Sequence, residues 1–344
     1  MSSVTEEQIR EALKQVKYPG FSRDIISFGI LKGVALEQDP KGILLAVTTQ
    51  DPKIVETIRT ESVIALAGLL PGHRFEVQVQ MVTPAQTMQA GTQSIPGVGH
   101  IIAVASGKGG VGKSTVAANL ACALKRGGMS VGLLDCDIYG PSMGLMFGTS
   151  EQPYADEENR IEPVTAHGIR LMSMGFLMAE DAPAILRGPM VTRYTQQLLM
   201  MTRWGSLDVL LLDLPPGTGD IHLTIVQTVA LSGAVIVTTP QDIALLDAKK
   251  GVTMFQKTNV KILGLVENMS YFTCPQCGHR EEIFSHGGAR KEAARLGVTL
   301  LGEIPLDLKI RTGGDSGVPI VMGEPEGPHA RAFQALAEAV RKQI

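Results

Sequence analysis

Length, composition and charge set the first limits on what this chain can be. Its 344 residues allow two or three domains with a large core, and its formal net charge of −3 lacks the basic excess of nucleic-acid-binding proteins. No apolar run approaches the roughly 20 residues that span a bilayer, and residues 1–17 are charged and amphipathic, unlike a signal peptide. Four cysteines in so long a chain do not indicate a disulfide framework. We therefore expect a cytoplasmic protein with neither nucleic acid nor a membrane as its partner.

The first 82 residues combine helical and strand patterns into a small α+β domain. The patterns predict a helix at 6–16, a hairpin with its turn at 39–42 and its second strand at 43–49, a helix at 52–69 and a strand at 75–81. Residues 83–99 follow as a polar stretch punctuated by Pro and Gly, with no periodic apolar pattern to bury. We predict that 1–82 is one domain and that 83–99 is a linker.

Residues 100–344 alternate continuous apolar runs with helical segments. The apolar runs lie at 101–105, 131–134, 169–172, 209–212, 234–238, 262–267 and 300–304. Continuous rather than alternating apolar runs are typical of strands buried on both faces. The pattern therefore predicts an α/β fold, with a doubly wound, mostly parallel sheet as one domain over 100–344.

A Gly-rich motif follows the first of these runs. Gly107, Gly112, Lys113 and Ser114 fit G-x-x-x-x-G-K-[ST], the P-loop whose backbone N–H groups enclose phosphates. A helical stretch at 116–126 follows, and the positive end of a helix dipole favours an anion there. We expect Lys113 to neutralise the β- and γ-phosphates and Ser114 to bind Mg²⁺. The predicted nucleotide contacts of this loop are Gly107, Lys108, Gly109, Gly110, Val111, Gly112, Lys113, Ser114 and Thr115.

Lys108 occupies a position that the phosphate cradle does not itself require. With this second lysine, residues 107–115 resemble the deviant Walker A motif. In that motif a lysine at this place reaches across a dimer interface to the partner's nucleotide, so the resemblance implies a catalytic role for Lys108 and a homodimer. The alternative is a solvated loop lysine.

Aspartates follow two of the predicted strands, where ligands of doubly wound sheets bind. Asp213 ends the run at 209–212 and is the expected Walker B ligand of Mg²⁺, which prefers hard oxygens. Asp137, two residues beyond the strand end, is placed to orient or deprotonate the attacking water. Residues 217–219, Gly-Thr-Gly, are a candidate switch segment. The alternative is that these aspartates cap helices. For Asp135, which follows the run at 131–134, the capping role and a role at the site are equally well supported.

Two further strand ends offer a pocket for the base. Asn268 has an amide with both donor and acceptor capacity, suited to the adenine edge. Pro305 and Asp307 follow the last strand and are a second possible wall of that pocket. Neither signal is specific, because Asn and Pro at strand ends are common in turns.

The segment after Asn268 contains a C-x-x-C motif, Cys274 and Cys277. The Pro and Gly in and after this motif bend the backbone so that both thiolates point to one side, as zinc and iron-sulfur ligation require. Two thiolates do not complete a four-cysteine site, but a symmetric dimer supplies each ligand twice. The alternatives are a zinc knuckle completed by His279 or His286, a thioredoxin-like redox pair, and two inert thiols.

Together these stretches resemble the Mrp (ApbC) family of iron-sulfur cluster carrier ATPases, within the deviant Walker A group that includes MinD, ParA and nitrogenase iron protein. The matching stretches are 101–115, 133–142, 211–220, 266–270, 274–278 and 304–321. The resemblance implies a homodimer that binds ATP and Mg²⁺. It also implies a labile [4Fe-4S] cluster, bridged by Cys274 and Cys277 of both subunits and passed to apo iron-sulfur proteins. Cluster scaffold or donor proteins are further partners that the resemblance implies.

The first domain resembles the small iron-sulfur-assembly domain often fused to bacterial members of that family. The chain departs from that domain at 48–52, Thr-Thr-Gln-Asp-Pro, where a reactive cysteine is often found and none is present. The departure leaves the share of residues 1–82 in cluster handling open.

The main rival interpretation is a MinD- or ParA-like positioning or switch ATPase with a structural zinc at the C-x-x-C motif. Such an ATPase needs a membrane or DNA surface. The helix predicted at 330–344 has an apolar stripe of Phe333, Leu336, Ala337 and Val340. A stripe of this kind more often packs on its own domain than on lipid. A nitrogenase-reductase-like electron donor is also possible, but its cluster ligands emerge from switch regions.

Overall fold

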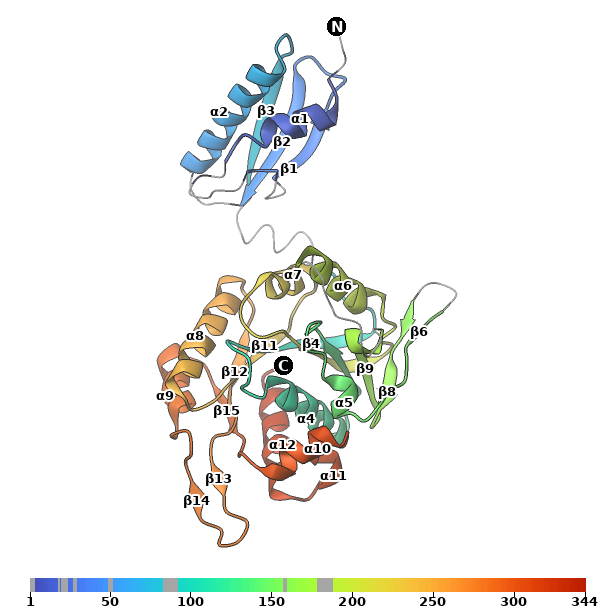
Figure 1. Ribbon diagram of the computed structural model, residues 1–344, viewed down its shortest axis with the longest axis vertical. Coiled ribbons are helices and arrows are strands. Elements are labelled where there is room, and N and C mark those ends of the chain that lie inside the picture. The colour runs from blue at the N-terminus through green and yellow to red at the C-terminus, as the bar shows by residue number, and fades with distance from the viewer. Residues whose placement is uncertain are drawn as a thin grey trace. The chain divides into compact units, whose positions relative to one another are not determined.

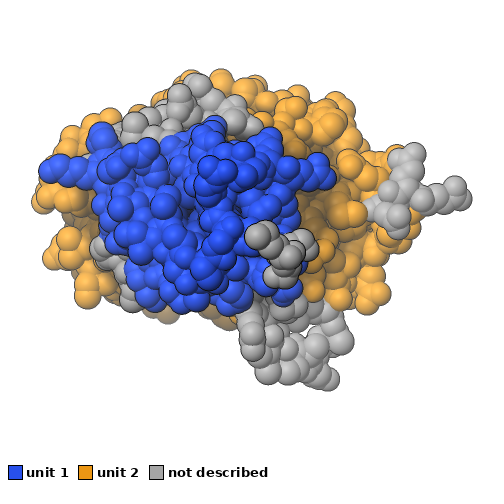
Figure 2. Space-filling model, turned by 90° about the horizontal axis from the view of Figure 1, so that it is seen from above, with its two compact units in different colours: residues 1–90 blue, residues 91–344 orange. Residues whose placement is uncertain are grey.

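The protein divides into two compact units, Met1–Ala90 and Gly91–Ile344 (Figure 2). The structure is a computed structural model and describes residues 4–17, 19, 24–26, 30–48, 52–82, 92–156, 160–177 and 188–344. Most of the predicted linker, residues 83–91, lies outside the described residues.

The first unit is a three-stranded sheet with two helices. Its elements are α1 (Glu6–Leu13), β1 (Leu31–Ala35), β2 (Lys41–Thr48), α2 (Pro52–Leu69) and β3 (Phe75–Val82). Strands β1 and β2 form the predicted antiparallel hairpin, and α2 connects β2 to the parallel strand β3. The first helix ends at Leu13, earlier than the expected residue 16, and the cysteine-free segment includes residues 49–51, which lie outside the described residues. Ile9, Leu45 and Ile58 are fully buried in the core of this unit.

The second unit contains an eight-stranded sheet. In spatial order its strands are β15 (Leu300–Glu303), β12 (Ile262–Glu267), β11 (Gly233–Thr238), β4 (Val98–Ser106), β10 (Leu207–Asp213), β5 (Val131–Asp135), β9 (Ile169–Ser173) and β8 (Val164–Ala166). All neighbours are parallel except β8 and β9, which are antiparallel. The apolar runs therefore form the buried parallel sheet that the sequence predicts.

Helices cover both faces of this sheet (Figure 1). They are α4 (Lys113–Arg126), α5 (Met143–Met146), α6 (Gly188–Met201), α7 (Asp220–Thr228), α8 (Asp242–Lys257), α9 (Gly288–Leu296), α10 (Leu308–Asp315), α11 (Ile320–Gly323) and α12 (Pro328–Arg341). Right-handed crossovers place α4 on the same face as α12, and α6 to α9 on the opposite face. A short 3₁₀ helix (Met174–Phe176) and a two-stranded hairpin, β6 (Tyr154–Ala155) with β7 (Ile161–Glu162), complete the region beyond β5.

The C-terminal helix α12 packs on its own domain, as the sequence predicts. Phe333, Leu336 and Val340 are fully buried, and they belong to the same core cluster as the side chains of α4. The apolar stripe is therefore not available to a membrane surface. Across the described part of the chain, no helix has both the length and the apolar character needed to cross a membrane.

The strand order brings three carboxyl ends together at one point. From β4 the chain continues to β5 on one side, whereas β11 pairs with β4 on the other side. Asp213, the last residue of β10, is in register with Val104 of β4 and with Asp135 of β5. Ligands of open α/β sheets bind at such a switch point, and here the P-loop follows β4 directly.

Candidate nucleotide site and cysteine hairpin

The P-loop is shaped by glycines with left-handed backbone geometry. Gly110 has φ 82° and Gly112 has φ 76°, a region that residues with a Cβ rarely adopt. A Cβ on Gly112 would lie 2.2 Å from Nδ2 of Asn268, and one on Gly107 would lie 2.1 Å from the backbone of Asp247. Helix α4 starts at Lys113, so its amino-terminal N–H groups and its dipole face the space that the loop surrounds.

Lys113, Ser114 and Asp213 form one buried hydrogen-bonded group. The Lys113 ammonium donates to Oδ1 of Asp213 at 2.5 Å, and the Ser114 hydroxyl donates to Oδ2 at 2.7 Å. The side chain of Lys113 is 6% exposed and that of Asp213 is fully buried. Burial raises the pKa of the Asp213 carboxyl, although the adjacent Lys113 ammonium opposes this. The structure thus brings together the cation expected to bind phosphate and both expected Mg²⁺ ligands.

Asp135 and Asp137 organise the loop after β5. Asp135 accepts hydrogen bonds from the backbone N–H groups of Asp137, Ser142 and Met143, at 2.9 to 3.3 Å, and from the Ser173 hydroxyl. Burial and the nearby Asp213 raise the pKa of Asp135 to about 7. Asp135 therefore serves the structural, cap-like role that was one of its two interpretations. Asp137 is half-buried and accepts from Gly140 N at 3.3 Å.

The candidate switch segment is attached to the P-loop strand. Gly217 N donates to the carbonyl of Ser106 at 2.9 Å, and Gly217 has φ 95°. Lys108 follows Ser106 by two residues and is half-exposed, with its carbonyl accepting from the Ser106 hydroxyl at 2.9 Å. In the part of the chain that the structure describes, no carboxylate pairs with the Lys108 ammonium.

A pocket of about 330 Å³ adjoins the P-loop. The predicted base-site residues Asn268, Pro305 and Asp307 all line it, together with Gly112 and Thr115 of the P-loop motif. Residues from the loop after β5, from α5 and from α10 complete the pocket, including Ser142, Met146, Ile310 and Arg311. The volume and the position beside the phosphate loop fit a purine base.

Two of the predicted base contacts already have partners. Nδ2 of Asn268 donates to the carbonyl of Val111 at 2.8 Å, which ties the end of β12 to the P-loop. Asp307 caps α10 by accepting from Lys309 N at 2.7 Å, and its other oxygen lies 3.3 Å from Nε2 of His329. Asn268 retains its amide oxygen as an acceptor, whereas the Asp307 carboxylate contributes structure to the pocket wall.

Cys274 and Cys277 lie on a hairpin that extends from the domain (Figure 1), formed by β13 (Phe272–Thr273) and β14 (Arg280–Glu281). Gly278 has φ 72°, and its N–H donates to the Cys274 carbonyl at 2.9 Å, which closes the turn. Cys274 is partly exposed and Cys277 is exposed. Backbone hydrogen bonds from Cys277 and Gln276 lower the pKa of the Cys274 thiol, and this favours the thiolate that binds metals. Cys122 and Cys136 are buried, and burial raises the pKa of both thiols.

A complete metal site is not present within one chain. Among the described residues, no three His, Cys, Asp or Glu side chains are grouped so that they could hold a metal ion. His279 lies 3.3 Å from Glu281 and His286 lies 3.5 Å from Glu282, so each histidine has a carboxylate neighbour on its own segment. The zinc knuckle within one subunit therefore has no third ligand among the residues that the structure describes.

Comparisons with known proteins agree with this combination of sites. Residues 97–341 match the family described as ParA, NUBPL iron-transfer P-loop NTPase. The chain belongs to this family of iron-transfer P-loop NTPases. It is 42% identical, over 99% of its length and 98% of the relative's, to the iron-sulfur cluster carrier protein of Synechocystis. It is also 51% identical, over 73% of its length and 78% of the relative's, to the iron-sulfur cluster transfer protein NUBPL of Dictyostelium discoideum.

Solved structures of P-loop NTPases share the fold of the second unit. A nucleotide-binding protein from Archaeoglobus fulgidus, in complex with ADP, is 40% identical, with a TM-score of 0.60, over 69% of this chain and 92% of that chain. The cell-division ATPase MinD of Pyrococcus furiosus is 27% identical, with a TM-score of 0.55, over 72% of this chain and all of that chain. The shared fold and the matched P-loop make this chain an ATPase of the MinD and ParA type, as the sequence predicts.

Three residues of this family member are not indicated by the sequence motifs. Ser142 lines the base pocket, and its buried hydroxyl has no hydrogen-bond partner within the described chain. His222 on α7 is 1% exposed, and both of its ring nitrogens lack a partner there. Buried Glu267 accepts from the Ser270 hydroxyl and from Ala289 N, each at 2.7 Å, and so fixes the loop that carries Asn268. The only sequence signal for these three residues is their position near the end of a strand or next to the switch segment.

Proposed function

We propose that this chain is an ATP-dependent iron-sulfur cluster carrier that binds its cargo between two subunits and delivers it to apo iron-sulfur proteins. The observation that carries the proposal is the connection of two sites by one loop. Strand β12 is followed directly by Asn268, whose side-chain amide donates to the carbonyl of Val111 in the P-loop. The same segment continues four residues later into the exposed hairpin with Cys274 and Cys277. The names of the relatives, cluster carrier and cluster transfer proteins, support the same function.

The nucleotide end of the site has the groups that phosphoryl transfer needs. Lys113 and the amino-terminal N–H groups of α4 neutralise the phosphates, and Lys108 adds a cation from the partner subunit. Ser114 and Asp213 offer the two hard oxygens that Mg²⁺ prefers, and the ion would neutralise charge that develops on the phosphates. Asp137 orients the attacking water from the loop after β5. These residues together make the chain an ATPase, with Asn268 and Pro305 at the base.

The cysteine end of the site matches a cluster shared across a two-fold axis. Each subunit contributes Cys274 and Cys277, so a symmetric pair supplies the four thiolates of a [4Fe-4S] cluster. Both side chains are accessible, and the lowered pKa of Cys274 favours its thiolate. An exposed hairpin also suits a cluster that must leave again, because solvent and an acceptor can reach it. The domain over 1–82, linked through 83–99, is an accessory iron-sulfur-assembly-like domain without its usual cysteine.

Anaerobic reconstitution with iron and sulfide tests this function. We expect four irons and four sulfides per dimer, a [4Fe-4S] signature in Mössbauer spectra, and transfer of the cluster to an apo-acceptor. Cys274→Ala and Cys277→Ala should each abolish both binding and transfer, since each removes two of the four ligands. Cys122→Ala is the matched control, because this thiol is buried in α4 and should leave the iron content unchanged. Tight zinc that resists reconstitution, or a cluster that persists in both hairpin variants, would overturn the carrier function.

A further inference from the structure

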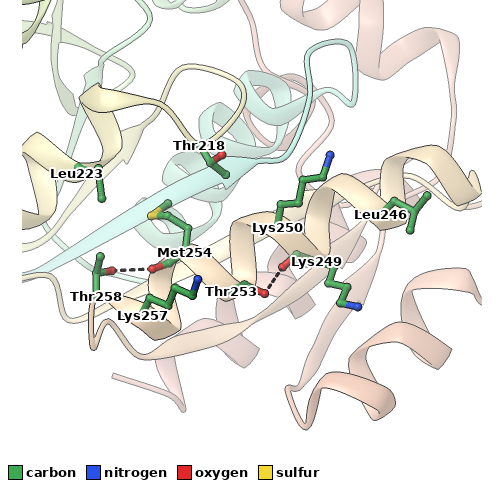
Figure 3. A pocket seen from close by; sticks show the side chains of 9 residues that line it. All are labelled: Thr218, Leu223, Leu246, Lys249, Lys250, Thr253, Met254, Lys257 and Thr258. Atoms are coloured by element: carbon green, nitrogen blue, oxygen red, sulfur yellow. Dashed lines mark hydrogen bonds between the residues drawn. The ribbon is translucent and has the colours of Figure 1, made fainter. Parts of the chain in front are cut away.

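A second, larger pocket lies beside the switch segment and shares no lining residue with the base pocket. Its volume is about 640 Å³. Nine residues line it, and they are Thr218, Leu223, Leu246, Lys249, Lys250, Thr253, Met254, Lys257 and Thr258 (Figure 3). We call this pocket the α8 groove, because α8 or its C-terminal residue supplies all the lining residues except Thr218 and Leu223.

The shape of the α8 groove suits a helix. The lining residues of α8 run from Leu246 to Thr258, which corresponds to about 18 Å at 1.5 Å per residue. Figure 3 shows the groove extending along this helix, with Thr218 and Leu223 on the opposite side. A groove of this length accommodates about three helical turns, and amphipathic helices commonly bind proteins in this way.

The chemistry of the α8 groove is apolar with a cationic edge. Leu246 is 60% exposed and Leu223 is 39% exposed, so the groove presents a leucine from each of its walls to solvent. The hydroxyls of Thr253 and Thr258 donate to carbonyls of α8 and so present their methyl groups. Lys249, Lys250 and Lys257 are exposed, and none of the described lining residues carries a negative charge. The complementary occupant has apolar side chains on one face and carboxylates beside them.

One wall of the α8 groove contacts the P-loop, and the other contacts the end of the strand that precedes it. Thr218 follows Gly217, whose N–H donates to Ser106 at 2.9 Å. On the other wall, Lys250 pairs with Asp247 at 2.9 Å, and the backbone of Asp247 packs so tightly on Gly107 that a Cβ there would lie 2.1 Å away. The groove and the nucleotide loop therefore share two direct backbone contacts.

We propose that the α8 groove binds an acidic amphipathic helix of a partner protein, and that the bound nucleotide controls this binding. The interaction goes beyond cluster carrying and requires no metal at Cys274 or Cys277. Apolar contacts with Leu223 and Leu246 supply affinity, and Lys249 and Lys257 select carboxylates. In the described chain neither of these two lysines has an acidic partner, so both are available to the helix.

The test uses the metal-free full-length protein and a labelled synthetic peptide of about 18 residues that forms a helix. The peptide carries Leu at i, i+3 and i+7 with Glu beside them, and a second peptide carries Lys in place of Glu. We expect the acidic peptide to bind at least tenfold more tightly than the basic one. A photoreactive group at its centre should crosslink to α8. Its affinity should differ at least threefold between ADP and a non-hydrolysable ATP analogue, each with Mg²⁺.

Charge reversal supplies the decisive comparison. The double variant Lys249→Glu and Lys257→Glu should lose at least tenfold affinity for the acidic peptide and gain affinity for the basic peptide. Lys342→Glu, an exposed lysine after α12, is the matched control and should change neither. Equal binding of both peptides, or no effect of the double reversal, would overturn the proposal that the α8 groove binds an acidic helix. Dodecanoate that displaces the peptide and binds more tightly would assign the groove to a small anion instead. Equal affinity with both nucleotides overturns the nucleotide control.

Discussion

The ammonium of Lys113 lies 2.5 Å from the carboxylate of Asp213, one at the start of α4 and the other at the end of β10. In a loaded P-loop site these two groups serve different ligands, the phosphates and Mg²⁺. Here each satisfies the other in a buried place, with Ser114 as a third member. Phosphate and Mg²⁺ therefore compete with this pair for the same two charged groups. Each charge of the pair offsets the cost of burying the other.

This relationship separates the effects of two substitutions at Asp213. Asp213→Asn keeps an acceptor for Lys113 but removes the charge that holds Mg²⁺, so we expect nucleotide binding to persist while ATP turnover falls at least 100-fold. Asp213→Ala leaves the buried ammonium unpaired and should lower the free energy of unfolding by about 3 kcal/mol. Turnover assays with and without Mg²⁺, together with denaturant unfolding, measure both effects.

Asp137→Asn provides the contrast, because Asp137 is not among the expected metal ligands. That variant should keep Mg²⁺-dependent ATP binding and lose mainly turnover. If Asp213→Asn instead hydrolyses ATP at the wild-type rate, Asp213 is not the metal-binding carboxylate. If Asp137→Asn loses binding but retains normal turnover per bound nucleotide, the role of Asp137 is structural.

Gly112 and Gly110 share a positive φ but differ in their surroundings. Alanine at either position adds about 1 kcal/mol of left-handed strain, equivalent to roughly fivefold in affinity. Alanine at Gly112 also meets Nδ2 of Asn268 at 2.2 Å, whereas nothing lies within 4 Å at Gly110. We expect Gly112→Ala to weaken nucleotide binding at least 100-fold and Gly110→Ala only about fivefold, as measured by calorimetry.

A double-mutant cycle assigns the difference to Asn268. Adding Asn268→Ala to Gly112→Ala removes the clash, so the double variant should bind nucleotide more tightly than Gly112→Ala alone. The single variant Asn268→Ala shows how much affinity the amide itself provides through the base. No recovery in the double variant would mean that the glycine is required by the nucleotide rather than by its neighbour.

The sequence predicts the elements of this site better than their interactions. Apolar runs and the P-loop spacing are local signals, and β4, β10 and α4 lie where those signals place them. The ion pair between Lys113 and Asp213 joins residues that are 100 positions apart in the sequence, and no periodic pattern indicates such a contact. For the same reason the sequence alone leaves Asp135 equally suited to bind a ligand or to cap a helix. In the structure its carboxylate accepts from the backbone N–H groups of Ser142 and Met143, which is the capping role.

We expect the buried His222 to lower the free energy of unfolding in acid. Burial, and the nearby Lys113 ammonium, lower the pKa of His222 to about 4 from its usual 6.5. The unfolded chain therefore takes up a proton before the folded chain does. The stability that this residue contributes is complete above pH 6.5 and is lost as the pH falls toward 4. At pH 5 the loss should be about 2 kcal/mol.

Unfolding free energies at pH 7 and pH 5 measure this effect. In His222→Asn the difference between the two pH values should shrink by about that amount, since the titrating group is gone. His73→Asn is the control, because His73 lies in the first unit and is partly exposed. An unchanged pH difference in His222→Asn would show that other groups cause the acid sensitivity.

A mixture of two variants tests whether Lys108 acts on the nucleotide of the partner subunit, which no single variant can show. Lys108→Ala should lose most of its ATP turnover, and so should Lys113→Gln, which keeps a donor for the buried Asp213. In a mixed dimer, the site with intact Lys113 receives Lys108 from its partner. Two inactive proteins should therefore recover activity when their subunits exchange, to about a quarter of wild type in an equal mixture, because half of the dimers are mixed and each has one complete site. Coexpression with two affinity tags isolates the mixed dimer directly. If Lys108 acted on the nucleotide of its own subunit, both sites of the mixed dimer would stay incomplete and no activity would return.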